Sequence, residues 1–167
     1  MVGSRLIPLL VSQGHRVTGL VRDVARAREE PALAGIRLLQ GDLRRPETLA
    51  SAVEGMDVVI HLAVLGHFNE GQSGADDFTR TNVAGTSALF QACLDAGVSR
   101  VVYTSTSAAL GFVKAKIIDE NAVPNPLTPY GESKLEADRV VQRFAARGLP
   151  VVTLRFTHIY GPGDRRD

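Results

Sequence analysis

The chain alternates between two kinds of segment: short runs rich in β-branched residues, and longer amphipathic stretches that close at a glycine. Runs of the first kind predict strands and stretches of the second kind predict helices. Strands alternating with helices build a parallel sheet that the helices cover, so we expect an α/β fold with a doubly wound parallel sheet. Strands are expected over residues 16–21, 36–40, 57–63, 100–103 and 151–156, and helices over 4–13, 24–34, 46–54, 76–95 and 130–147.

One of these runs, Asp57–Ala63, has almost no polar alternation. A parallel strand covered on both faces has this composition, so the run predicts a central strand. His61 lies within it, and a histidine on an apolar strand is more often packed in a core than a ligand. A loop with three glycines is expected after it, over residues 64–75.

The charge balance limits the partners that this chain can have. The 167 residues include 19 Lys plus Arg and 18 Asp plus Glu, for a net charge of +1, which offers no electrostatic surface for nucleic acid or an anionic membrane. No apolar run approaches the roughly 18 residues of a membrane span, and the start lacks a signal-peptide pattern. The lone Cys93 excludes an internal disulfide, and no zinc-ligand spacing is present. We therefore expect a single cytoplasmic domain without a metal.

The most informative spacing is that of Tyr130 and Lys134. On a helix, residues four apart share a face, and an ammonium beside a phenol lowers the pKa of the tyrosine and makes it a usable acid or base. An isolated pair of this kind is more often a surface packing pair. Here it opens a helix after a proline-rich loop and follows a strand that ends in the hydroxyl cluster Thr104–Ser107. This context favours a catalytic role.

Taken together, the motifs of the chain resemble those of the extended short-chain dehydrogenase/reductase family. This NAD(P)-dependent group includes sugar-nucleotide epimerases and dehydratases, dihydroflavonol-type reductases and 3β-hydroxysteroid dehydrogenases. The resemblance implies a Rossmann-type fold and an oxidoreductase or epimerase acting on a carbonyl or secondary alcohol of a small molecule, such as a nucleotide sugar. The motifs that carry it are Gly3–Leu6, Gly41–Leu43, His61–Ala63, Asn82–Thr86, Thr104–Ser107, Tyr130–Lys134 and Arg155–Pro162.

The resemblance also implies roles at the reacting centre. Tyr130 would be the catalytic acid/base, and Lys134 would lower its pKa and hydrogen-bond the nicotinamide ribose. Counting back from Gly111 places the substrate-orienting hydroxyl at Thr106, with Ser105 just before it as the alternative. Asn82 would support the site, although an asparagine that bonds backbone inside a helix is an equal alternative.

For the cofactor, the resemblance implies contacts along the strand ends. Asp42 would bond the adenine and Leu43 would pack beside it, although a simple turn aspartate is the alternative for Asp42. The backbone near Ile159 would face the nicotinamide amide. The remaining residues of the implied dinucleotide site are Gly3, Arg22, Leu62, Ala63, Val64, Asn82 and Lys134.

The end of the second strand bears on the choice of cofactor. NAD-preferring enzymes place an acid there for the ribose 2′-hydroxyl, whereas an arginine accommodates a 2′-phosphate. Counted from Gly3, the acid's position is Val21, and Arg22 follows it. The sequence therefore favours NADP over NAD, with Asp23 as the residue that could instead serve the ribose of NAD.

The chain also departs from the family pattern. Of the glycine motif only Gly3 remains, and the family's first strand and C-terminal substrate lobe are expected to be missing, which would leave the edges of two neighbouring strands exposed. Residues 1–167 would then be a partial NAD(P)-binding domain. A longer parent could be active while this chain is not.

Three alternatives to a nucleotide-sugar enzyme stay open: a dihydroflavonol- or steroid-type reductase, a non-catalytic dinucleotide-binding sensor, and an inactive fragment. Tyr130 and Lys134 argue against a pure sensor. The resemblance also implies a homodimer through helices 76–95 and 130–147. Four apolar residues of these helices could contribute to it, although core packing explains them equally well: Leu89, Phe90, Val140 and Val141.

Overall fold

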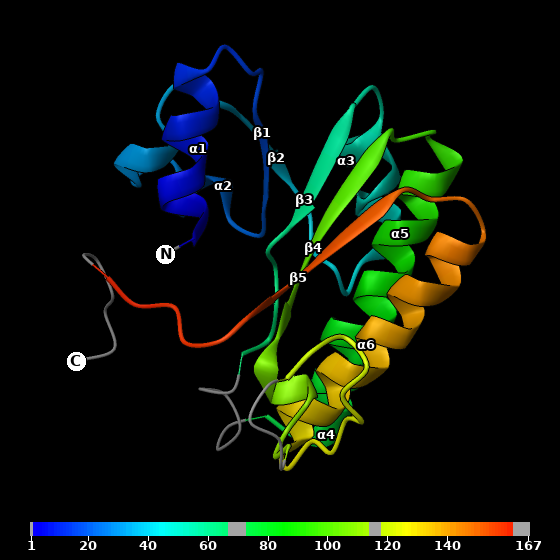
Figure 1. Cartoon of the computed structure of the whole chain (residues 1–167). Coiled ribbons are helices and arrows are strands. Elements are labelled where there is room, and N and C mark those ends of the chain that lie inside the picture. The colour runs from blue at the N-terminus through cyan, green and yellow to red at the C-terminus, as the bar shows by residue number, and fades with distance from the viewer. Residues whose placement is uncertain (1, 67–72, 114–117, 162–167) are drawn as a thin grey trace.

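A computed structural model describes residues 2–66, 73–113 and 118–161 of the chain. Within this part, the strands form two separate sheets, and every strand pairing is parallel (Figure 1). The first sheet pairs β1 (Thr18–Val21) with β2 (Arg37–Gln40), and the second holds β3 (Val58–His61), β4 (Arg100–Thr106) and β5 (Val151–Phe156) in that order.

The helices divide between the two sheets. Helix α1 (Val2–Ser12) lies beside β1 and β2, and we call these three elements the N-terminal unit. Helices α3 (Ala50–Val53), α5 (Gly85–Asp95) and α6 (Pro129–Ala146) cover one face of β3–β5, and we call this assembly the helix-covered sheet (Figure 1). The predicted α/β class with parallel strands and flanking helices is confirmed.

Helices α5 and α6 both end where the sequence predicts. Gly97 and Gly148, just after them, have φ angles of 67° and 97°, in the left-handed region that glycine enters without a steric penalty. The long predicted helix over 76–95 contains three segments: α4 (Ala75–Phe78), a π-helical stretch η4 (Thr79–Ala84) and α5.

Two predicted helices are broken in the structure. The stretch 24–34 forms only the short α2 (Val24–Ala27) and a separate 3-10 turn, η1 (Pro31–Leu33). Proline lacks a backbone N–H and disfavours helical backbone in the residue before it, so Pro31 starts a new element. The stretch 46–54 is also divided, into η2 (Pro46–Thr48) and α3, with Leu49 between them.

The expectation that residues 57–63 form a central strand covered on both faces is wrong for the described structure. Strand β3 pairs with β4 on one edge, and among the described strands it has no partner on the other. Val58 on this strand is 49% exposed. An apolar run indicates that its residues prefer burial. It does not indicate whether the strand has a neighbour on both edges. Among the described strands, β1 pairs with β2 alone and β3 with β4 alone.

The hydrophobic core lies within the helix-covered sheet. Phe90 and Tyr103 at its centre are fully buried and meet edge to face with ring centroids 6.0 Å apart. Cys93 is a buried free thiol in the same cluster. The four apolar residues considered for a dimer contact, Leu89, Phe90, Val140 and Val141, all belong to this core.

Helix α1 has no buried residue. In the described part of the chain, no helix has the length and apolar character needed to cross a membrane. Residues 2–66, 73–113 and 118–161 also contain no group of three or more His, Cys, Asp or Glu side chains that could hold a metal ion.

Candidate active site

The first turn of α6 is fixed against the end of β4. The Thr128 hydroxyl caps the helix by accepting a hydrogen bond of 3.1 Å from the Gly131 backbone N–H, and Pro129 occupies the first turn. A Cβ atom on Gly131 would lie only 2.6 Å from the carbonyl oxygen of Ala108. Only glycine allows this close approach, which brings the start of α6 against the turn that follows β4.

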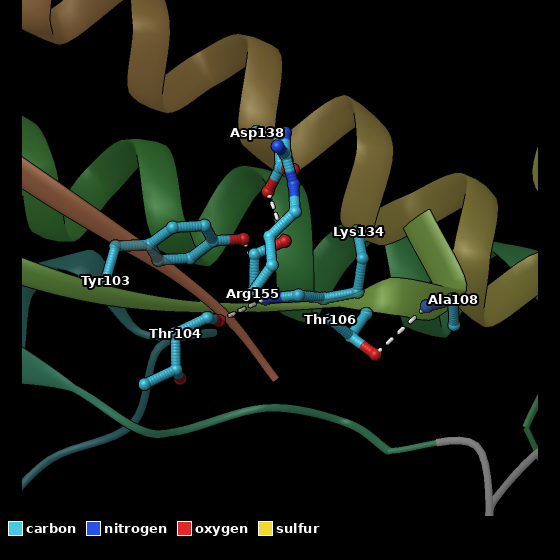
Figure 2. Close-up of polar contacts among 8 residues, drawn as sticks. Tyr103, Thr104, Thr106, Ala108, Lys134, Asp138 and Arg155 are labelled. Atoms are coloured by element: carbon cyan, nitrogen blue, oxygen red, sulfur yellow. Dashed lines mark hydrogen bonds and ion pairs between the residues drawn. The ribbon is translucent and has the colours of Figure 1, made fainter. Parts of the chain in front are cut away.

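Lys134 projects from this helix into the protein. Its side chain is 3% exposed, and its Nζ donates to the Tyr103 hydroxyl at 2.6 Å and to the Thr104 carbonyl at 2.9 Å (Figure 2). Burial lowers the pKa of Lys134 to about 8, and the nearby carboxylate of Asp138 opposes this shift. The lysine therefore changes charge close to neutral pH.

Tyr130 lies one helical turn before Lys134 and is half-buried. Its ring packs edge to face against Phe78 of α4, with centroids 6.3 Å apart. The two hydrogen bonds described for Lys134 go to β4 rather than to Tyr130.

The two candidate hydroxyls lie on opposite faces of β4, because side chains alternate along a strand. Ser105 is buried and donates to Asp138 Oδ1 at 2.7 Å. Thr106 is half-buried, and its Oγ1 accepts a hydrogen bond of 3.2 Å from the Ala108 N–H (Figure 2). The proton of Ser105 is engaged inside the protein, whereas Thr106 is reachable from outside.

Asn82 connects the loop after β3 to the start of α6. It is buried in the π-helical stretch η4, a feature often found near functional sites. Its Oδ1 accepts from Leu65 N at 2.8 Å, and its Nδ2 donates to Leu65 O and to Ser133 Oγ, both at 3.0 Å. Both amide protons are thus used within the protein, and the residue positions the elements around the site.

Several residues of the implied dinucleotide site meet near the start of α1. A Cβ on Gly3 would lie 3.6 Å from Leu62 Cδ1, so the helix start and the end of β3 are adjacent. Ala63 and Val64 continue from Leu62 and are exposed. The half-buried Ile159 lies on the segment that follows β5.

The turn after β2 has a structural role that the sequence left open. Asp42 Oδ1 accepts from Arg44 N at 2.9 Å, as a turn-forming aspartate does. Leu43 is buried in the core, where a Cβ on Gly85 would lie only 2.7 Å from Leu43 Cβ.

At the end of β1, Arg22 and Asp23 differ in their surroundings. The Asp23 carboxylate caps α2 by accepting a hydrogen bond of 3.0 Å from the Arg26 N–H. Arg22 is exposed, and its carbonyl accepts from the Gln40 side chain at 3.3 Å. Asp23 is therefore partly committed to its own helix, while the Arg22 side chain extends from the surface.

Three members of the polar network around Lys134 were not singled out as site residues from sequence. Tyr103 and Asp138 flank Lys134, and Arg155 donates to Asp138 Oδ2 from Nε at 3.2 Å and from Nη2 at 3.0 Å. The spacing of Asp138, four residues after Lys134, was a usable signal, since it places both on one helix face. His61 is packed in the core as predicted, with Nε2 3.0 Å from Thr86 Oγ1.

The parallel sheets with flanking helices place the chain in the class of Rossmann-like α/β proteins. It belongs to the NAD dependent epimerase/dehydratase family, whose model matches residues 1–167.

Three similar proteins illustrate the range of this family. A UDP-glucose 4-epimerase of Azospirillum brasilense is 32% identical over 96% of this chain and 47% of its own length. A 4-hydroxy-2-methyl-3-oxo-4-farnesyl-3,4-dihydroquinoline-1-oxide ketoreductase of Stigmatella aurantiaca is 31% identical over 98% of this chain and 48% of its own. The structure of MoeE5 in complex with UDP-glucose and NAD is 36% identical, with a TM-score of 0.85 over 98% of this chain and 53% of that one. The chain thus spans about half the length of the relatives it matches.

Proposed function

We propose that this chain carries the dinucleotide-binding and acid/base parts of an NAD(P)-dependent enzyme. The enzyme acts on a carbonyl or secondary alcohol of a small molecule such as a nucleotide sugar. The observation that carries the proposal is the position of Tyr130 and Lys134 on one helix whose first turn packs against the end of β4, where Thr106 lies.

In this proposal, the side chains of the site handle one proton and one substrate oxygen. The Tyr130 phenol oxygen exchanges the proton of the substrate's hydroxyl or carbonyl oxygen. The Thr106 hydroxyl donates a hydrogen bond to the same oxygen, and its greater exposure supports it over Ser105. The Lys134 ammonium favours the phenolate form of Tyr130. A nicotinamide ring, when bound, supplies the acceptor or donor of the hydride.

The residues present fit such a dinucleotide. Gly3 lies in the first turn of α1, where backbone N–H groups and the helix dipole favour a phosphate, and it adjoins Leu62 at the strand end. Lys134 uses two of its three N–H donors on β4, which leaves one for a ribose hydroxyl. We assign Asp42, Ala63, Val64 and Ile159 to the same binding surface, with the buried Leu43 packed beneath Asp42, and Asn82 to the support of the loop after β3.

The acid/base assignment is tested by Tyr130→Phe, which removes the phenol oxygen but keeps the ring against Phe78. We expect turnover of a UDP-sugar or ketone substrate to fall at least a hundredfold, the low end of a general acid/base contribution. Cofactor affinity measured by calorimetry should stay unchanged. Tyr160→Phe, the same change at an 86% exposed ring, is the matched control. Full turnover by Tyr130→Phe would overturn the assignment.

The cofactor preference that we propose is NADP over NAD, with Arg22 facing the 2′-phosphate. The capping role of Asp23 supports this choice, whereas MoeE5, a similar structure, is complexed with NAD. Arg22→Ala should weaken NADPH binding about tenfold and leave NADH binding unchanged, while the exposed Arg28→Ala should change neither. An unchanged ratio of NADPH to NADH affinity in Arg22→Ala would contradict the assignment.

A second candidate is a reductase that consumes its cofactor, which the similarity to the ketoreductase favours. An epimerase returns its cofactor to the starting state, whereas a reductase oxidises one NAD(P)H per product. Absorbance at the nicotinamide band during turnover distinguishes the two: a steady loss of NAD(P)H indicates a reductase, and a constant level indicates an epimerase.

Two sequence predictions about the cellular context remain proposals. The first is a cytoplasmic location, checked by fractionation of the source cells. The second is a homodimer through residues 76–95 and 130–147. Since Leu89, Phe90, Val140 and Val141 are used in the core, such a dimer must use the outer faces of these helices. Sedimentation showing only monomer at high concentration would exclude it.

A further inference from the structure

Two buried polar residues beside Lys134 have no part in the proposed reaction. Tyr103 on β4 is 0% exposed, and Asp138 on α6 is 4% exposed. Burying a polar or charged group is unfavourable unless it is hydrogen-bonded. The partners of these two groups therefore indicate what they do.

Lys134 is held at two points of one strand. Its Nζ donates to the Tyr103 hydroxyl at 2.6 Å and to the Thr104 carbonyl at 2.9 Å, and Figure 2 shows the side chain extending toward β4. The phenyl ring of Tyr103 also lies under the ammonium, with Nζ 4.3 Å from the ring centroid. A lysine side chain is long and flexible, so these contacts define where its remaining N–H points.

Asp138, one helical turn after Lys134, contacts the same face of β4 further along the strand. It accepts a hydrogen bond from Ser105 Oγ at 2.7 Å and pairs through Oδ2 with two guanidinium nitrogens of Arg155. The ion pair that the described residues give Asp138 is this one with Arg155. Asp138 therefore acts on Lys134 through its charge.

Tyr103 is a neutral group between these two charges. Burial raises the pKa of Tyr103 far above its ordinary value, and the charge of Asp138 and its hydrogen bond with the phenol raise it further. The phenol therefore keeps its proton. Its oxygen accepts a hydrogen bond of 2.6 Å from Lys134, and the charge of Asp138 lies close enough to act on the same phenol.

We propose that Tyr103 is a positioning residue for Lys134: its neutral hydroxyl ties the amine to β4 and stabilises its charged form. This inference rests on the proposed role of Lys134 and goes beyond it. A carboxylate in the place of this phenol would form a tight ion pair with the lysine. A phenyl ring would leave one buried N–H without an acceptor.

The other groups that face Lys134 are compatible with this role. From β3, His61 is neutral, because burial and the charge of Lys134 lower its pKa to about 3. From α6, Tyr130 lies one turn away on the same helix face. From β5, the charge of Arg155 is paired with Asp138. Tyr103 is thus the uncharged side chain in direct contact with the amine.

A direct test measures the pKa of Lys134 in the chain itself. The sequence contains only three lysines, so carbon-13 labelling of lysine Cε gives three NMR signals, and Lys134→Arg identifies the one from Lys134. Tyr103→Phe keeps the ring packing but removes the acceptor. A hydrogen bond to a charged group corresponds to about one to two pKa units, so the pKa of Lys134 should fall by that amount from about 8.

The outcomes separate positioning from general damage. The signals of the other two lysines report any effect that is not specific to Lys134. An unchanged pKa of Lys134 in folded Tyr103→Phe would overturn the proposal. If Tyr103→Phe does not fold, Asp138→Asn takes its place, and it should lower the same pKa because the Asp138 charge raises it. No change there would likewise overturn it.

Turnover supplies a second readout that a purely structural role would not move. With less charged lysine at a given pH, the alkaline limb of kcat for Tyr103→Phe should move to lower pH by about one to two units, with the KM for substrate unchanged. A uniform loss of rate at every pH would contradict the proposal. The NMR arm needs no turnover, so it decides the role of Tyr103 even if Tyr130→Phe shows that the proposed function is wrong.

Discussion

The N-terminal unit and the helix-covered sheet differ in how much of their apolar surface is buried. Helix α1 has no buried residue and Leu9 on it is 53% exposed, whereas Phe90 and Tyr103 in the helix-covered sheet are fully buried. The proposed acid/base residues all lie in the second region. The proposed dinucleotide contacts are spread over both regions: Gly3, Arg22 and Asp42 belong to or follow elements of the first, and the others belong to the second. Chemistry that needs fixed distances is thus carried by the part of the molecule with a close-packed core.

The largest expected effect is a loss of unfolding free energy in the helix-covered sheet, compared with the same kind of substitution in the N-terminal unit. Phe90→Ala removes a fully buried ring that packs against His61, Tyr103 and Phe144, so it should cost about 3–5 kcal/mol of unfolding free energy. Leu9→Ala on the exposed face of α1 should cost less than about 0.5 kcal/mol. Urea denaturation measures both. Equal losses would show that α1 is packed as tightly as the core.

The stability of the helix-covered sheet should also depend on pH through His61. This residue is neutral in the folded protein, because burial lowers its pKa to about 3. In the unfolded chain its pKa is about 6.5, so below that pH the unfolded state binds a proton that the folded state does not. Stability should therefore fall by roughly 2–4 kcal/mol between pH 6.5 and 3. Urea midpoints at several pH values measure this loss. His61→Asn should reduce it and the exposed His15→Gln should not; an equal loss in His61→Asn would exclude His61 as its source.

A smaller change tests the contact between α6 and the end of β4. In Gly131→Ala the new Cβ would lie 2.6 Å from the Ala108 carbonyl oxygen, so the helix start must shift, at a cost of about 1–3 kcal/mol. Because the shift displaces Tyr130, turnover should fall along with the thermal midpoint. Gly74→Ala, where a Cβ meets no atom within 4 Å, is the matched control. Equal behaviour of the two variants would mean that α6 does not depend on this contact.

Much of the fold was predictable because local patterns reflect local physics. Strand β5 was expected over 151–156, where it is observed, and both long helices end near the glycines that the sequence marks. The position of β3 at a sheet edge was not predictable, because its apolar run is the same with or without a neighbouring strand. The break of 24–34 at Pro31 was visible in the sequence, whereas the division of 46–54 at Leu49 has no proline to mark it.

The placing of candidate site residues beside one another was predictable within a single helix. It was less predictable for residues that lie on different elements. The pairing of Tyr130 and Lys134 followed from a spacing of four residues. The proposed preference for Thr106 over Ser105 needed the direction in which each side chain leaves β4, which the sequence does not give. Tyr103 was not found, because a tyrosine in an apolar strand has the pattern of a core residue; it is one, and its hydroxyl also contacts Lys134.

The smallest expected effect tests whether the cost of a substitution depends on the burial of the side chain rather than on its position along the chain. Glu136 lies on α6, two residues before Asp138, and forms an exposed ion pair with Arg139 at 2.9 Å. Since solvent screens such pairs, Glu136→Gln should change the unfolding free energy by less than about 0.5 kcal/mol. Asp138→Asn on the same helix leaves the Arg155 guanidinium without its buried partner and should cost about 3 kcal/mol. Chemical denaturation of the two variants measures the contrast, and a cost for Glu136→Gln that matches Asp138→Asn would show that the charges of α6 act together rather than according to their burial.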